Sequence, residues 1–260
     1  MVNKNSTSVL FVVVFFLCSF GPLPAHGAEV SIIAAADLQY ALKDVVAAYA
    51  KKYPADKATL VFGSSGKAYS QIASGAPHDI FFSADISYPL KLKTAGLTVS
   101  APKPYATGRI GIWATKKSGL DVKQGPAALL DSRVKTIAIA NPEHAPYGRA
   151  AKAALEHYKL YDRLKDKIVM GEDIQQTAQF VQSGAADAAI IAASLALAPV
   201  LAEAGNFYLL PASSHPEILQ GYVRLKRATA NSAGRRFEAF IGGGEARAIF
   251  KHYGFALPHE

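Results

Sequence analysis

The sequence predicts a two-lobed α/β protein in which each lobe is a mainly parallel sheet flanked by helices. Short apolar strands alternate with amphipathic helices from residue 30 onward, a pattern typical of parallel sheets covered on both faces. Two alternating sets follow each other without a Gly/Ser linker, which favours lobes joined by strands. The 260 residues, 50% of them apolar, are enough for two buried cores. We therefore expect a hinged ligand cleft between the lobes.

The first lobe begins with a predicted strand at 30–34. A helix follows, because apolar residues recur at helical spacing from Leu38 to Tyr49. Two more strand–helix pairs are expected at 58–62 with 67–73 and at 79–83 with 87–95.

The second lobe is expected to begin with a strand at 109–114. Its other predicted elements are strands at 136–140, 167–170, 188–192 and 207–210, and helices at 148–157 and 174–183. A returning strand at 221–224 and helices at 233–240 and 245–252 end the chain. The expected boundaries are 28–108 for the first part of lobe 1, 109–221 for lobe 2 and 222–260 for the return to lobe 1.

The N-terminal segment, residues 1–27, has the order of a secretory signal peptide. Lys4 precedes a 12-residue apolar run at 9–20, and the small-x-small triplet Ala25-His26-Gly27 follows. The run is too short to span a bilayer comfortably. We expect export through this signal peptide, with cleavage near Gly27 removing the single cysteine, Cys18.

The composition excludes several classes of site. One cysteine cannot form a disulfide framework or a cysteine-rich metal centre within one chain. The histidines show no clustering at metal-ligand spacing, so no residue is expected to ligate a metal cation directly. The net charge of +8 is scattered, without a long basic run, and no nucleic-acid partner is expected.

Four loops share one design, in which a buried strand ends in small or polar residues and a helix starts at once. They are 34–39, 62–67, 140–148 and 170–174. Helix N-termini carry unsatisfied N–H groups and a partial positive charge. Several of them converging on a cleft can bind an anion without a lysine or arginine, although each loop taken alone is better explained by ordinary helix capping.

In order along the chain, these motifs resemble the periplasmic molybdate-binding proteins of ABC transporters. The most specific segment is Gly75-Ala-Pro-His-Asp-Ile-Phe-Phe-Ser-Ala-Asp85, and Phe250-Lys-His-Tyr-Gly-Phe255 matches the C-terminal end. The resemblance implies a type II periplasmic-binding-protein fold that holds molybdate or tungstate with neutral donors. It also implies a monomer without a cofactor, which is not an enzyme and delivers its anion to an inner-membrane permease driven by a cytoplasmic ATPase.

The resemblance also implies which residues hold the oxyanion. The expected ligands are Asp37, Ser65 and the backbone N–H groups of Tyr147 and Ile174. Possible accessory residues are Ser64, Lys67 and Ala192. Asp37 stands where the family has a serine, and Ala192 where it has a tyrosine; the Tyr147 hydroxyl could replace that missing tyrosine as a neutral donor.

Asp37 requires a physical account, because a carboxylate about 4 Å from an anion is repelled by roughly 4 kcal/mol at an effective dielectric near 20. Its side chain could cap its own helix, which we favour from the sequence. Alternatively, Lys67 could neutralise it, or Asp37 could accept a proton from a protonated oxyanion such as hydrogen phosphate.

Two other functions remain open at this stage. One is binding of phosphate or sulfate, favoured to the extent that Asp37 faces the ligand. The other is an exported hydrolase with Asp37 or Asp173 as general base, because a fold does not determine a function.

Overall fold

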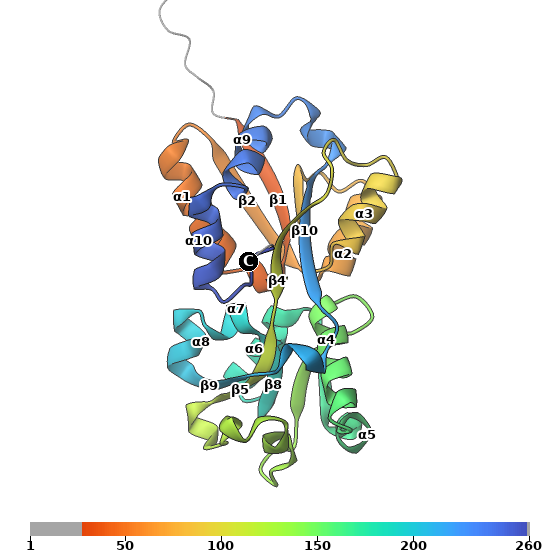
Figure 1. Cartoon of the computed structure of the whole chain (residues 1–260), viewed down its shortest axis with the longest axis vertical. Coiled ribbons are helices and arrows are strands. Elements are labelled where there is room, and N and C mark those ends of the chain that lie inside the picture. The colour runs from red at the N-terminus through yellow and green to blue at the C-terminus, as the bar shows by residue number, and fades with distance from the viewer. Residues whose placement is uncertain (1–27, 259–260) are drawn as a thin grey trace, which may run out of the picture.

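The computed structural model describes residues 28–258, which form two five-stranded sheets, each covered by helices. The two lobes are stacked along the long axis of the molecule (Figure 1). The predicted signal peptide, residues 1–27, lies outside the described residues. In the described part of the chain, every helix is too short or too polar to cross a lipid bilayer.

Lobe 1 contains a sheet in the order β2-β1-β3-β10-β4. Helices α1, α9 and α10 lie on one side of this sheet and α2 and α3 on the other (Figure 1). The strands are β1 (Glu29–Ala35), β2 (Lys57–Gly63), β3 (Ile80–Ser83), β4 (Lys103–Gly108) and β10 (Ile218–Arg224). The helices are η1 (Ala36–Leu38), α1 (Ala41–Lys52), α2 (Ser65–Ala73), α3 (Ser87–Thr94), η6 (Lys226–Thr229), α9 (Ser232–Ile241) and α10 (Gly244–His252), of which η1 and η6 are 3₁₀ helices.

Lobe 2 contains a sheet in the order β7-β6-β8-β5-β9, with α4 and α6 packed against β6 and β8. Its strands are β5 (Ile110–Thr115), β6 (Ile137–Ala140), β7 (Ile168–Gly171), β8 (Ala188–Ala192) and β9 (Gly205–Leu209). Its α-helices are α4 (Pro146–His157), α5 (Tyr161–Leu164), α6 (Ile174–Gln182), α7 (Ala193–Ala196) and α8 (Pro199–Ala204). Its 3₁₀ helices are η2 (Lys116–Ser118), η3 (Val122–Leu130), η4 (Lys165–Lys167) and η5 (Ala212–Ser214).

Both sheets are mainly parallel, as the alternation of strands and helices predicts. In lobe 1, β2, β1 and β3 pair in parallel and β10 alone runs in the opposite direction, between β3 and β4. In lobe 2, β5 is the reversed strand, between β8 and β9. In each lobe, the reversed strand is the first strand after the chain crosses from the other lobe. Entry from the opposite lobe therefore explains why this strand runs against its neighbours.

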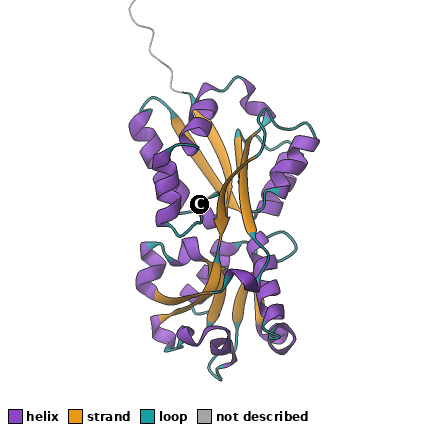
Figure 2. Ribbon diagram, in the orientation of Figure 1, coloured by secondary structure: helices purple, strands orange, loops and turns teal. Residues whose placement is uncertain are grey.

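The lobes are joined by two extended segments (Figure 2). The first runs from β4 into β5 with only Arg109 between them, and the second runs from β9 to β10. Because β10 begins at Ile218 and pairs with lobe 1, the predicted boundary at residue 221 falls inside this strand. Strand β4, with exposed residues at Lys103 and Pro104, has little apolar pattern and was not predicted.

Each lobe has its own core. The core of lobe 1 contains many aromatic side chains: Phe82 stacks on Tyr222, and Phe237 meets Tyr49 edge to face. In lobe 2, Trp113 is fully buried among aliphatic residues. Ala35, Ala36 and Ala84 of lobe 1 pack into the lobe 2 core cluster. Small apolar residues therefore allow the backbones of the two lobes to approach closely.

Gly148, in the first turn of α4, illustrates how tightly the helix start is held against its strand. A Cβ at Gly148 would lie 2.1 Å from the carbonyl oxygen of Ala140, at the end of β6. We expect Gly148→Ala to lower the free energy of unfolding by about 1–3 kcal/mol through overpacking, measured by denaturant unfolding with circular dichroism. The matched control is Gly244→Ala at the start of α10, where a Cβ meets nothing within 4 Å; equal stability of the two variants would contradict this packing.

Candidate functional site

A small cavity lies between the lobes, where four strands end and helices begin. The strands β1 and β2 lead into η1 and α2 of lobe 1, and β6 and β7 lead toward α4 and α6 of lobe 2. The cavity measures about 10 Å³, a space for about one water molecule. A larger guest requires the lobes to separate slightly. The lining residues are Ala35, Ala36, Asp37, Gly63, Ser64, Ser65, Ala84, Ala145, Pro146, Tyr147, Asp173 and Ile174.

All four residues predicted to be principal ligands, Asp37, Ser65, Tyr147 and Ile174, line this cavity. They come from four different elements and from both lobes. No lysine, arginine or histidine is found among the lining residues within 28–258. The groups in this lining that can attract an anion are therefore N–H and O–H dipoles.

Ile174 offers a backbone N–H at the start of α6. The Asp173 carboxylate caps this helix by accepting hydrogen bonds from the N–H groups of Gln175 and Gln176, both at 2.9 Å. The cap therefore satisfies the second and third N–H groups and leaves the first, that of Ile174, available to the cavity.

Ser65 is fully buried at the start of α2 and offers a hydroxyl. Its Oγ accepts a hydrogen bond from the Ala84 N–H at 2.9 Å. A hydroxyl has one hydrogen to donate. Because Ala84 occupies the acceptor side, the Ser65 hydrogen is left to donate into the cavity.

Ser64 of lobe 1 and Tyr147 of lobe 2 both line the cavity. Ser64 caps α2, and its Oγ lies 2.9 Å from Nδ1 of His144 in lobe 2. Tyr147 lies in the first turn of α4, so its backbone N–H has no partner within the helix. Its hydroxyl, however, donates to Asp37 Oδ2 at 2.9 Å. That hydrogen is engaged by Asp37 and does not replace the missing tyrosine donor.

Asp37 does not cap its helix, and the preferred sequence interpretation was wrong on this point. It lies inside η1, whose N-cap position is Ala35, and no side-chain cap hydrogen bond is present there. Instead, Oδ2 accepts hydrogen bonds from Tyr147 and from Nε2 of Gln220, the latter at 2.7 Å. Asp37 is thus not at the N-cap position of η1, and its buried carboxyl has hydrogen-bond partners from other segments instead, as buried polar groups require.

The environment of Asp37 disfavours its charge. The residue is 1% exposed, and burial raises the pKa of its carboxyl to about 7, although hydrogen bonds from Gln220, from Tyr147 and from its own backbone N–H act in the opposite direction. Its second oxygen, Oδ1, is buried and has no hydrogen-bond partner among the described residues. Asp37 is thus a buried carboxyl in the cavity wall with one unsatisfied oxygen.

Gln220 is a site residue that the sequence analysis missed. This fully buried side chain on β10 donates to Asp37 and to the Tyr147 hydroxyl, the latter at 2.8 Å, and accepts from the Tyr105 hydroxyl. Burial, together with the Asp37 charge, raises the pKa values of Tyr105 and Tyr147 well above 10, so both phenols stay neutral. A single glutamine within an apolar strand was the available signal in the sequence.

Several polar contacts join the lobes around the cavity. The Gly66 N–H donates to the His144 carbonyl at 2.9 Å, and Lys67 forms an ion pair with Glu172. On the opposite side, Ser194 Oγ donates to the Asp37 carbonyl at 2.8 Å. These contacts link lobe 1 to lobe 2, so the two lobes are held in contact around the cavity.

Unlike the four principal residues, the possible accessory residues do not all line the cavity. Ser64 lines the cavity, but Lys67 is absent from its lining and pairs with Glu172 at the surface, so Lys67 does not neutralise Asp37. Ala192 ends β8, is fully buried and is also absent from the lining. Its methyl group has no hydrogen to donate to an oxyanion.

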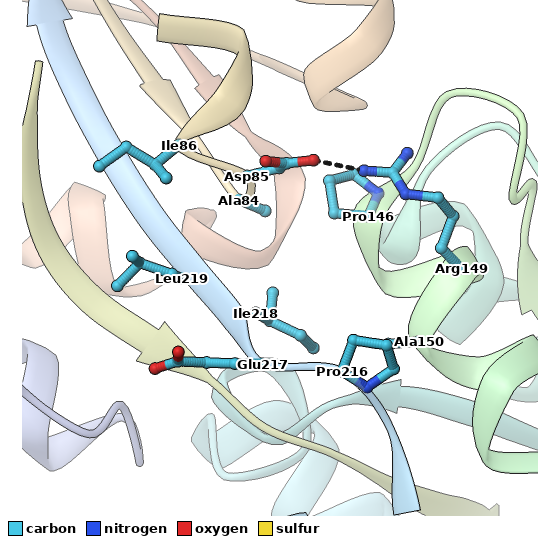
Figure 3. Close-up of a pocket in the computed structure, with 10 residues that line it drawn as sticks. All are labelled: Ala84, Asp85, Ile86, Pro146, Arg149, Ala150, Pro216, Glu217, Ile218 and Leu219. Atoms are coloured by element: carbon cyan, nitrogen blue, oxygen red, sulfur yellow. Dashed lines mark hydrogen bonds and ion pairs between the residues drawn. The ribbon is translucent and has the colours of Figure 1, made fainter. Parts of the chain in front are cut away.

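A larger pocket of about 270 Å³ adjoins the cavity and shares Ala84 and Pro146 with it. Figure 3 shows the ion pair of Asp85 with Arg149 at 2.6 Å, which spans the two lobes along one wall of this pocket. Glu217 adds a second carboxylate without a second cation in the lining. This charge balance is unfavourable for an anion, so the small cavity is the better candidate site.

Comparison with known proteins agrees with this architecture. The sequence profile of the bacterial extracellular solute-binding proteins matches residues 30–256. The chain belongs to this family. It is 34% identical to the molybdate-binding protein ModA of Azotobacter vinelandii over 234 residues, which cover 90% of this chain and 92% of ModA. It is 32% identical to ModA of Rhodobacter capsulatus, with 90% of each chain covered.

Solved structures give the same result for the fold. The Azotobacter vinelandii periplasmic molybdate-binding protein superposes with a TM-score of 0.82 at 31% identity, covering 89% of this chain and all of that one. The sulfate-binding protein SubI of Mycobacterium tuberculosis superposes with a TM-score of 0.71 at 13% identity, covering 89% of this chain and 88% of SubI, which shows a shared fold alone.

The Gln220 hydrogen bonds lead to a stability prediction. Gln220→Leu removes a partner from Asp37, Tyr147 and Tyr105 at once, and we expect the free energy of unfolding to fall by about 1–3 kcal/mol because buried polar groups lose their partners. The control is Gln179→Leu, at an exposed position of α6. Denaturant unfolding measures both; a loss no larger in Gln220→Leu than in the control would contradict the structural role.

Proposed function

We propose that this protein is a periplasmic solute-binding protein that captures molybdate or tungstate for uptake by an ABC transporter. The observation that carries the proposal is the cavity between the lobes, which presents the Ser65 hydroxyl and the N–H groups of Tyr147 and Ile174 without a lining cation. The names of the relatives that share about a third of its residues support molybdate as the ligand.

The arrangement suits a small oxyanion for two physical reasons. The N-termini of α2, α4 and α6 direct partial positive charge toward one point. The donors are also fixed by their own helices and caps, so little side-chain entropy is lost on binding. In the proposed cycle, the two lobes open and close about the segments near Arg109 and ahead of β10, so that β10 moves with lobe 1.

The transport partners in this proposal are an inner-membrane permease and a cytoplasmic ATPase, and the protein acts as a monomer without a cofactor or catalysis. Export depends on the predicted signal peptide at 1–27. Relatives described as ABC-transporter or molybdate-binding proteins support this placement.

A second candidate ligand is phosphate, and the unsatisfied Asp37 Oδ1 is the observation that favours it. Monohydrogen phosphate carries a proton that an ionised carboxylate can accept, whereas molybdate at neutral pH carries none.

A thermal-shift panel of molybdate, tungstate, sulfate, phosphate and chromate tests the proposal. A ligand present at 100 times its Kd stabilises the folded state by about 2.7 kcal/mol, or roughly 5–10 °C for a chain of this size. We expect this shift with molybdate or tungstate. A shift with phosphate and none with molybdate or tungstate would assign the protein to the second ligand.

Ser65 allows a sharper test of the cavity. Ser65→Ala removes one hydrogen bond to a charged ligand, and we expect molybdate affinity to fall by about 10-fold to 150-fold, corresponding to roughly 1.5–3 kcal/mol. Ser70→Ala is the matched control, since Ser70 lies on the same helix with its hydroxyl bonded to the Gly66 carbonyl. Calorimetric titration compares the two; an unchanged Kd for Ser65→Ala would remove Ser65 from the site.

A further inference from the structure

The buried oxygen Oδ1 of Asp37 is the one feature of the cavity that neutral-donor binding leaves unexplained. Oδ2 is occupied by two donors, Tyr147 and Gln220, whereas Oδ1 has no partner among the described residues. An ionised carboxylate has acceptors only. With the charge on Asp37, Oδ1 would therefore repel the oxygens of an oxyanion bound in the same cavity.

No described cation compensates for this carboxylate. The side chains bonded to the Asp37 carboxyl are the neutral Tyr147 of α4 and Gln220 of β10, and Gln220 accepts in turn from the neutral Tyr105 of β4. Ser194 of α7 uses its hydroxyl on the Asp37 carbonyl.

The other titratable groups near the cavity act elsewhere. Asp173 lines the same cavity but caps α6. At the rim, Lys67 pairs with Glu172, and burial lowers the pKa of His144 below its usual range, with Lys67 contributing. His144 therefore loses its charge at lower pH than an ordinary histidine does, which separates its titration from a change in affinity between pH 7 and 9.

A proton on Oδ1 resolves the conflict. The carboxyl then keeps Oδ2 as an acceptor for Tyr147 and Gln220, and presents an O–H donor to the cavity in place of the serine hydroxyl that the family resemblance leads one to expect. We propose that Asp37 couples oxyanion capture to protonation: the closed site binds a dianion together with one proton, which resides on Asp37. This inference rests on the proposed function, since it specifies how that site admits a dianion.

The direction of the pH dependence follows. Burial already raises the pKa of Asp37 to about 7 in the closed structure, and a bound anion raises it further. Affinity for a dianion is therefore greatest where Asp37 is already protonated before binding, and it falls as pH rises from the pKa of the unliganded state toward the higher pKa of the liganded state. Between these two values, linkage sets a limiting loss of about tenfold in affinity per pH unit.

The test is calorimetric titration of the full mature protein with molybdate between pH 6 and 9, in buffers of different ionisation enthalpy. For the wild type we expect uptake of about one proton per molybdate at pH 8 and a roughly 10-fold to 100-fold weaker affinity at pH 9 than at pH 7. Asp37→Asn keeps an oxygen acceptor and adds a fixed N–H donor. We expect it to bind molybdate without proton uptake and with a flat pH profile.

Asp173→Asn is the matched control, because it neutralises the other carboxylate in the cavity wall. Whatever its affinity, it should still take up one proton. Circular dichroism confirms that each variant is folded, and Asp37→Ser provides a second proton-free variant with a hydroxyl in the same place.

Two results would overturn the coupling: no proton uptake by the wild type with a flat affinity from pH 7 to 9, or loss of all anion binding in Asp37→Asn. The second would mean that the ionised carboxylate is required, as expected for a monohydrogen phosphate site. If the wild type does not bind molybdate at any pH, the proposed function fails, and sulfate, also a full dianion, replaces it as the probe. Absence of proton uptake with both dianions then rejects the coupling as well.

Discussion

A hydrogen-bonded carboxyl buried between the lobes is the constraint on which the rest of this site depends. Asp37 belongs to lobe 1, Tyr147 to lobe 2, and Gln220 to the strand that returns from one to the other. The three side chains meet only when the lobes are together. The same contacts that close the molecule therefore decide the charge of the cavity wall.

The surrounding architecture supplies donors rather than charges. Parallel strands that end at one edge place helix N-termini side by side, and this topology occurs once in each lobe. Helix capping then determines which N–H groups are available to an anion. The Asp173 carboxylate accepts hydrogen bonds from the N–H groups of Gln175 and Gln176, so the N–H of Ile174 is available. An anion bound here is stabilised by dipoles fixed in the fold, which a second negative group such as ionised Asp37 would oppose.

Much of the fold and part of the site could be predicted from the sequence. The strand–helix alternation predicted both lobes, because apolar periodicity reports burial directly. Ser65 and Ile174 were placed at helix starts and line the cavity. Strand β4 was missed because its exposed Lys103 and Pro104 interrupt the apolar pattern. Gln220 was missed because its partners, Tyr105, Asp37 and Tyr147, are 73 or more residues away in the chain.

By itself the sequence determined the order of elements, the two-lobed α/β class and the loops that approach the cleft, since these depend on local periodicity and on residues adjacent in the chain. Only the tertiary structure decided the role of Asp37. An aspartate at the start of a helix commonly caps that helix, and the sequence interpretation followed this rule. In the folded chain a tyrosine hydroxyl and a glutamine amide reach the carboxyl from distant segments. Buried polar groups must find partners wherever the fold brings them, and that requirement is set by tertiary contacts that no local pattern encodes.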